Sequence, residues 1–132
     1  MLQDGQQLAY AAQFDFTKWS KQLSSFLGKG AEAMIALEEK EGKYNTEKHK
    51  NRLDIIIENW DKILTIIEQE LPSAEYIESF MKQCGFPLSC EEIGVEKESL
   101  KMTFMATKDI RDKYVLSRLC WDLGILEEMT IE

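Results

Sequence analysis

The strongest constraint in this sequence is a run of apolar residues with helical spacing that ends at a proline. Between Asn45 and Leu71 the apolar residues mostly recur in steps of one, three and four, which indicates an α-helix with one buried face. Asn45 or Thr46 can cap the first turn, because either side chain can accept hydrogen bonds from free amide groups. Pro72 ends the segment, since the residue before a proline avoids helical backbone angles. We therefore predict one helix over residues 45–71.

Helical spacing also runs through most of the remaining chain. We predict further helices over residues 16–27, 31–41, 73–84, 97–106 and 109–123, and a very short helix between Ser89 and Gly94. The first dozen residues are weakly patterned and either fray or form the stub of a helix. No segment shows the sustained alternation of a strand. The predicted fold class is therefore all-α: one compact domain over residues 1–132, with about six helices that are mostly antiparallel neighbours.

The charge balance argues against two classes of partner. The chain has 132 residues and a formal net charge of −8, and such a surface repels phosphate backbones and anionic lipid headgroups. No stretch approaches the ~20 apolar residues that a membrane-spanning helix needs, and the first ten residues lack a signal-peptide pattern. We therefore expect a cytoplasmic protein that binds neither nucleic acid nor a membrane.

Two features could carry chemistry, and both have a simpler structural explanation. Gly28-Lys29-Gly30 precedes a predicted helix, as glycines do in phosphate-binding loops, but no strand precedes it, so we favour a helix break. His49 is the only histidine and lies one position off the apolar face of the helix over 45–71. We therefore expect it at a solvated or edge position rather than in a catalytic or metal site.

Charged side chains are dense near the end of the chain. Arg111 and Arg118 lie seven residues apart, on one face of the helix predicted over 109–123. They could bind a carboxylate or a phosphate, but we favour ion pairs with glutamates of a neighbouring helix. Asp109 and Lys113 have the spacing of an ion pair within that helix.

The cysteines do not indicate a site either. The odd number of thiols, without a secretion signal, favours reduced cysteines in the cytosol. The spacing of Cys84 and Cys90 matches no zinc pattern, so we expect Cys84, Cys90 and Cys120 to pack as small apolar groups. From the residues alone, no side chain is assigned a catalytic, cofactor-binding or metal-binding role.

Three stretches together resemble one enzyme family. They are Gly30–Tyr44, Trp60–Ile63 with Glu70–Pro72, and the uninterrupted string ATKDIRDKYVLSRLCWDLG at Ala106–Gly124. All three are similar to the C-terminal part of bacterial sn-glycerol-1-phosphate dehydrogenases, which are relatives of glycerol dehydrogenase and dehydroquinate synthase. The resemblance covers roughly residues 28–128, and the third stretch is the most specific.

The resemblance implies an oxidoreductase of phospholipid metabolism with two domains. An N-terminal nucleotide-binding domain would hold NAD(H) or NADP(H), and a helical domain would complete the site. The family reaction is reversible hydride transfer between dihydroxyacetone phosphate and sn-glycerol 1-phosphate, with a divalent metal that polarises the carbonyl oxygen. The family holds this metal with one aspartate and two histidines, whereas this chain has one histidine in an unmatched context. No catalytic, cofactor or metal residue is therefore carried over.

These observations leave two functions open. The first is the C-terminal helical portion of such a dehydrogenase, inactive alone and lacking its nucleotide-binding domain as partner. It predicts an exposed apolar patch, for which Leu8, Phe14, Phe16 and Trp19 are candidates, and a homodimer could cover such a patch. The second is a stand-alone helical module for protein–protein interaction.

Overall fold

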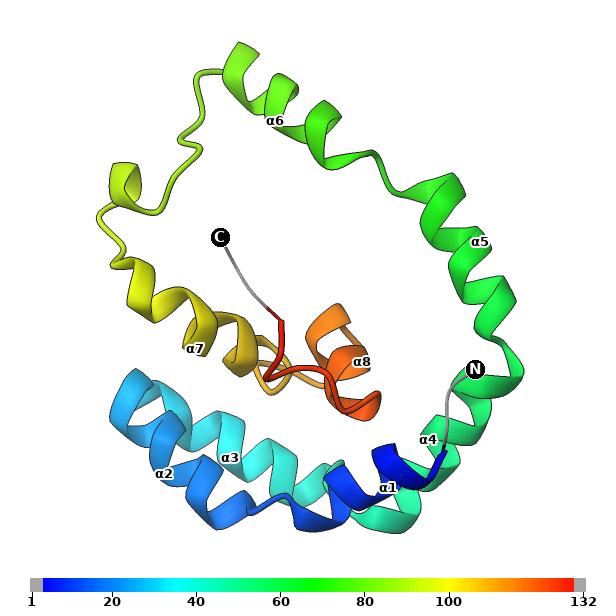
Figure 1. Ribbon diagram of the computed structural model, residues 1–132. Helices are drawn as coiled ribbons and strands as arrows, with labels where there is room; N and C mark the ends of the chain where they lie inside the picture. Colours follow the sequence, from blue (N-terminus) through cyan, green and yellow to red (C-terminus); the bar gives the residue numbers. More distant parts are fainter. Residues whose placement is uncertain (1–3, 130–132) are drawn as a thin grey trace.

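The computed structural model describes residues 4–129, and this part of the chain is all-helical, as predicted (Figure 1). The helices are α1 (Asp4–Gln13), α2 (Phe16–Leu27), α3 (Gly30–Glu41), α4 (Thr46–Glu58), α5 (Trp60–Glu70), α6 (Ala74–Gln83), the short 3₁₀ helix η1 (Glu91–Ile93), α7 (Lys97–Thr107) and α8 (Leu116–Asp122). Among the described residues α1 and α4 pack together, α2 packs on α3, and α8 packs on both α4 and α7. These eight α-helices exceed the predicted six because α1 forms and the longest predicted helix is divided.

The helix predicted over 45–71 is two helices, α4 and α5, which meet at Asn59. The backbone there leaves the helical region, with φ −112° and ψ 15°. The backbone amide and the side-chain amide of Asn59 both donate to the carbonyl oxygen of Ile55, at 3.1 and 2.8 Å. Asparagine is common at such helix ends because its side chain can bond to nearby backbone groups. The apolar spacing continues across Asn59, and therefore gave no sign of the break.

The predicted helix ends are confirmed where capping side chains were visible in the sequence. The Asn45 side chain accepts from two backbone amides of the first turn of α4, both at 3.0 Å. Helix α5 ends at Glu70, before Pro72. Ser89 and Glu92 each accept from the other's backbone amide, at 3.4 and 3.2 Å, which is the reciprocal cap that their spacing indicates.

The helix predicted over 109–123 is wrong in its first half. Helix α8 begins only at Leu116, and its preceding residue, Val115, is extended. Asp109 is fully buried and binds side chains from distant segments, which fixes the backbone of this region in turns and bends. The predicted ion pair of Asp109 with Lys113 therefore does not form: the recorded partner of Lys113 is Asp112, at 3.9 Å.

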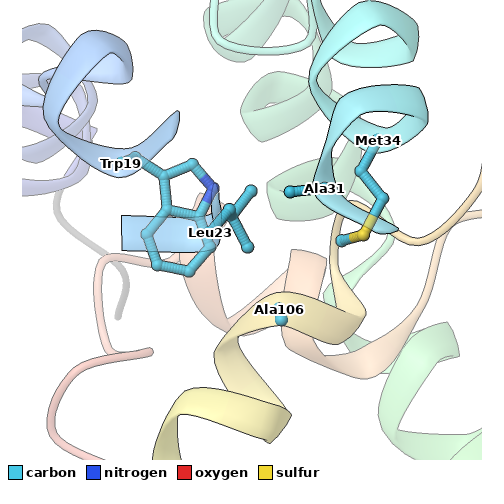
Figure 2. Close-up of a cluster of buried hydrophobic side chains, with 5 residues drawn as sticks. All are labelled: Trp19, Leu23, Ala31, Met34 and Ala106. Carbon is cyan, nitrogen blue, oxygen red and sulfur yellow. The ribbon is translucent and has the colours of Figure 1, made fainter. Parts of the chain in front are cut away.

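The core lies between the N-terminal helices and the last two helices. One buried cluster joins α2 and α3 to α7 through Trp19, Leu23, Ala31, Met34 and Ala106 (Figure 2). A second cluster surrounds Trp121, and a third joins α4 to the end of α8. The turn between α2 and α3 lets these two helices pack as antiparallel neighbours.

Helices α5 and α6 depart from this core. Both run in an arc away from the other helices, and the chain returns to α7 through η1 (Figure 1). Neither α5, α6 nor η1 contains a buried residue. Exposed apolar side chains are numerous here: Leu64, Ile66, Ile67, Leu71, Tyr76, Ile77, Phe80, Phe86, Leu88 and Ile93.

The expected apolar patch on Leu8, Phe14, Phe16 and Trp19 is wrong in its location. Trp19 is only 3% exposed, and the other three side chains are partly buried against core residues. Helix α1 packs on α4, and α2 packs on α3. These contacts cover the apolar faces for which the sequence alone indicated no partner. The exposed apolar surface is instead on the arc of α5 and α6.

Truncation of Leu53 tests this division into core and arc. Leu53 is 1% exposed, whereas Leu71 is 63% exposed. We expect Leu53→Ala to lower the unfolding free energy by about 2–5 kcal/mol, because it leaves a cavity in the core. The matched change Leu71→Ala should stay within about 0.5 kcal/mol. Urea unfolding followed by circular dichroism measures both, and equal losses would contradict the division.

Candidate functional site

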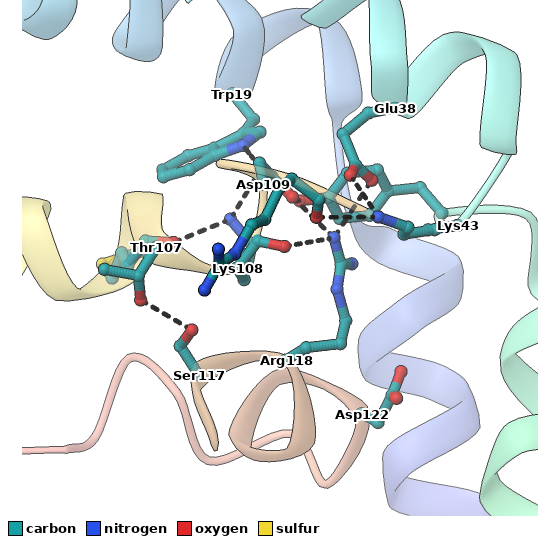
Figure 3. Close-up of polar contacts among 12 residues, drawn as sticks. Trp19, Glu38, Lys43, Thr107, Lys108, Asp109, Ser117, Arg118 and Asp122 are labelled. Carbon is teal, nitrogen blue, oxygen red and sulfur yellow. Dashed lines mark hydrogen bonds and ion pairs between the residues drawn. The ribbon is translucent and has the colours of Figure 1, made fainter. Parts of the chain in front are cut away.

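The most concentrated polar chemistry in the described chain is a buried network around the carboxylate of Asp109 (Figure 3). The indole Nε1 of Trp19 donates to it at 2.6 Å, and the Tyr44 hydroxyl donates at 2.7 Å. The Arg118 guanidinium donates at 2.5 Å and the Lys108 ammonium at 3.2 Å. Asp109 is fully buried, so this carboxylate exchanges its hydration for four protein donors.

Arg118 extends the network to a second buried carboxylate. Its Nη2 also donates to Glu38 at 3.0 Å, and Lys43 donates to the other oxygen of Glu38 at 3.0 Å. Burial raises the pKa of Glu38 above its usual value, and the nearby charge of Asp109 adds to the rise. The prediction that Arg118 pairs with a glutamate of a neighbouring helix is confirmed.

A third buried carboxylate, Asp122, anchors helix α4 to the end of α8. Arg52 donates to it through Nε and Nη2, the shorter distance being 2.8 Å. The Tyr114 hydroxyl donates at 2.7 Å. Burial, together with the charge of Asp122, raises the pKa of the Tyr114 hydroxyl well above its usual range. The Tyr114 hydroxyl therefore keeps its proton at neutral pH.

His49 lies beside this carboxylate and not at the surface. Its side chain is 0% exposed, its Nε2 is 3.0 Å from the carbonyl oxygen of Asp122, and its ring packs edge-on against Trp121. The expectation of a solvated or edge position was wrong. His49 lies four residues before Leu53 and seven before Ile56, the other buried residues of α4. Extending the apolar face of this helix by one turn toward its N-terminus would therefore have predicted that His49 is buried.

A cleft reaches the edge of the network at Lys108. It has a volume of about 500 Å³, and its lining combines aromatic side chains with three lysines, Lys18, Lys101 and Lys108. Lys108 is only 1% exposed, and its ammonium lies 3.4 Å from the centroid of the Trp19 ring. Burial lowers the pKa of Lys108 to about 8. The ammonium donates to Met105 and Asp109, and while it is protonated it has no lone pair for nucleophilic attack.

The other residues that the sequence singled out do not join this network. Arg111 is exposed and lies outside α8, so it does not share a face with Arg118. Gly28 closes α2 with a positive φ of +57°, and Gly30 opens α3. The predicted helix break at these glycines is confirmed. Cys120 packs in the core, Cys90 is partly buried, and Cys84 is exposed, which the packing prediction did not anticipate.

The donor set does not fit the divalent metal that the family resemblance implies. Residues 4–129 contain no group of three or more His, Cys, Asp or Glu side chains that could hold a metal ion. His49 and Asp122 come closest, at 3.8 Å, but the oxygens of Asp122 are already bound by Arg52 and Tyr114. A metal there would have to displace the guanidinium. These residues therefore do not form the metal centre that the family reaction uses.

A second concave surface is apolar. This groove has a volume of about 750 Å³ and lies between helices α4 and α5 on one side and residues 114–119 on the other. Its walls are mostly isoleucine and leucine, and its charged residues are Arg52 and Lys62. We call this surface the α5 groove. It has the apolar character of a binding site and lacks reactive groups.

Sequence reasoning did not identify the three carboxylates at the centre of this structure. Glu38 and Asp109 lie in charged stretches that indicate a solvated face, whereas Asp122 lies among apolar residues. One signal was present: aromatic donors and apolar residues are mixed with these charges at Tyr44 and in Ala106–Gly124. Several partners, such as Trp19, Tyr44 and Asp109, or Arg118 and Glu38, are 65 to 90 residues apart in sequence, and local spacing cannot pair them.

Comparisons with protein-family models, curated proteins and solved structures gave no match for this chain. In the described part of the chain, none of the helices has the length and apolar character needed to cross a membrane.

Removal of Arg118 should show that the network holds the fold. Arg118→Met leaves Asp109 and Glu38 buried without their shared cation, and we expect a loss of about 3–5 kcal/mol in unfolding free energy. Arg111→Met is the matched control, because Arg111 is exposed, and should change stability by less than about 0.5 kcal/mol. Urea unfolding measures both. A small loss for Arg118→Met would contradict a supporting role.

The ionisation of Lys108 gives a pH-dependent prediction. Its pKa is lowered in the folded protein, so between pH 8 and 10.5 the unfolded chain binds more protons and folding becomes more favourable as pH rises. Relative to Lys108→Met, the native chain should gain about 3 kcal/mol of stability from pH 7 to pH 10.5. Unfolding of both proteins across this range tests it. A constant difference would contradict the lowered pKa.

Proposed function

We propose that this chain is the C-terminal helical portion of an NAD(P)-dependent sn-glycerol-1-phosphate dehydrogenase, and that it is inactive alone. The observation that carries the proposal is the string Ala106–Gly124, the most specific part of the family resemblance. In this proposal the role of the string is to support the fold. The reacting groups, the cofactor and the divalent metal belong to a nucleotide-binding portion that precedes this chain and to the segment that joins the two.

The burial of the string supports this structural role. Lys108, Asp109, Arg118 and Asp122 are its buried charged residues, and each bonds to groups from other parts of the chain or to one another. Their positions are dictated by the network, because each must meet a specific donor or acceptor in the interior. A helical scaffold would need such buried charged residues for its own fold, even where none of them contacts the substrate.

The arc of α5 and α6 is consistent with a chain that normally has more protein around it. Monomeric proteins rarely expose extended apolar patches. Here Ile66, Tyr76 and Phe80 are 49%, 62% and 53% exposed, and they belong to helices without any buried residue. Such a surface would be covered in a larger assembly.

Fragment complementation tests the proposal. The chain alone should not oxidise NADH or NADPH with dihydroxyacetone phosphate and a divalent metal. Adding a separately expressed nucleotide-binding portion of a sn-glycerol-1-phosphate dehydrogenase, ending after its metal ligands, should produce turnover that depends on dihydroxyacetone phosphate.

The matched arginine variants make this experiment specific. Arg111→Met should restore turnover as the native chain does, whereas Arg118→Met should not, because its network is broken. Absence of turnover with the native chain, despite measured binding of the two portions, would contradict the dehydrogenase proposal.

A stand-alone interaction module is the alternative, and the α5 groove favours it because the groove is apolar and has no reactive groups. The native mass in the source cells separates the two functions. A protein roughly three times the size of this chain fits an added nucleotide-binding domain. A protein of the chain's own size fits the module.

A further inference from the structure

We infer that the cleft beside Lys108 binds a small organic anion, which carries a carboxylate or phosphate group on an apolar body. Lys18, Lys101 and Lys108 line this cleft, and we call it the lysine cleft. The inference concerns the isolated chain and rests on the side chains that line the cleft. It depends neither on the dehydrogenase assignment nor on the α5 groove.

The lysine cleft lies between helices α2 and α7. Lys101 belongs to α7 and Lys108 is its C-terminal cap; they are seven residues apart, about two helical turns, so they lie on one side of α7. Lys18 and Trp19 of α2 line the facing wall, and Figure 3 shows Trp19 beside Lys108. The volume of about 500 Å³ lies within the range of roughly 300–1,000 Å³ that is typical of small-molecule sites.

The lining is positively charged although the chain is acidic. Three lysines line the cleft with two carboxylates, Asp15 and Glu127, in a chain of formal net charge −8. The Asp15 carboxylate caps its own helix, because it accepts from the backbone amide of Lys18 at 2.9 Å. The Lys101 ammonium donates to the uncharged backbone carbonyl of Glu127 at 2.6 Å. Lys18 and Lys101 are exposed, so these two cations can turn toward an anionic ligand.

Two further donors among the lining residues have no acceptor. The Tyr10 hydroxyl and the indole Nε1 of Trp121 are buried, and neither has a hydrogen-bond partner within the described part of the chain. Burial, together with the charge of Glu127, raises the pKa of Tyr10 to about 12, so its hydroxyl keeps its proton at neutral pH. Buried donors are rarely left without an acceptor. These donors and the lysines favour a ligand whose polar end carries acceptor oxygens and negative charge.

The rest of the lining explains why the ligand should also have an apolar body. Phe14, Trp19, Met105 and Leu126 contribute apolar surface to the cleft. Ligand sites commonly combine such surface with a few polar groups that fix the orientation of the ligand. A ring or short carbon chain would cover these side chains, whereas a bare inorganic ion would leave them in contact with water.

NMR spectroscopy of the isotope-labelled full chain, at pH 7 and low salt, tests the site with benzoate and phenyl phosphate as probes. The chain has three tryptophans: Trp19 and Trp121 line the cleft, and Trp60 belongs to α5. Either probe should move the indole N–H signals of Trp19 and Trp121 and leave that of Trp60 in place, with a Kd below about 1 mM. The tighter probe identifies the preferred anionic group.

Two simpler compounds test the charge and the apolar body separately. Benzamide has the shape of benzoate without its charge, and should bind at least about tenfold more weakly than benzoate. Inorganic phosphate has no apolar body, and should bind at least about tenfold more weakly than phenyl phosphate. Equal binding of benzamide and benzoate, or of inorganic phosphate and phenyl phosphate, overturns the inference.

Lysine variants test which side chains bind the anion. Lys18→Gln and Lys101→Gln each remove one exposed charge, and each should weaken binding of the tighter probe about threefold. Lys18→Arg keeps the charge and should keep most of the affinity. The matched control is Lys21→Gln, because Lys21 is also exposed on α2 but lies outside the cleft; it should leave the Kd unchanged. Circular dichroism verifies that the variants remain folded.

Three further results would overturn the inference. One is the absence of any movement of the Trp19 and Trp121 signals at about ten times the expected Kd. Another is movement of the Trp60 signal alone, which would place the probe outside the cleft. The third is equal weakening by Lys18→Gln and Lys21→Gln, which would reflect only the net charge of the chain. Ligand binding is read by NMR and the dehydrogenase proposal by turnover, so either can fail alone.

Discussion

The carboxylate of Asp109 is fully buried, and surrounding side chains supply the hydrogen bonds that water would otherwise give it. Those side chains come from α2, from the segment before α4, and from α8. Each partner must therefore be in place for the carboxylate to be accommodated, and Arg118 then links the same group to Glu38 of α3. This requirement connects the N-terminal helices to the last helix and explains why residues 108–115 are not helical.

Much of the fold follows from local chemistry that the sequence displays. Apolar spacing placed most of the helices, and caps such as Asn45 and the stop at Pro72 follow from the hydrogen-bonding capacity of those residues. The departures have nonlocal causes or involve a single side chain. The break at Asn59 lies where the backbone and side-chain amides of that residue both bond to Ile55. Asp109 and Glu38 depend in part on partners that are distant in sequence, such as Trp19 and Arg118, so the local charge pattern resembled a solvated surface.

The structure therefore divides into a part whose charged residues are buried and paired, and a part whose apolar residues are exposed. Charged residues of Ala106–Gly124 are used internally, and this agrees with the proposed supporting role beside a nucleotide-binding portion. The arc of α5 and α6 exposes apolar side chains and contains no buried residue, and the α5 groove is the surface through which the chain would meet another protein. Arg52 and Tyr114 belong to both parts, because they bind Asp122 and also line the α5 groove.

The central claim is that Asp109 and Arg118 act as one buried unit. A double-mutant cycle of urea unfolding with Asp109→Asn, Arg118→Met and the combined variant tests it most directly. Removing either charge leaves the other without its partner, whereas removing both avoids that penalty. The account predicts that the double variant loses less than the sum of the single losses, by at least about 1.5 kcal/mol. Losses that add within about 0.5 kcal/mol would contradict it.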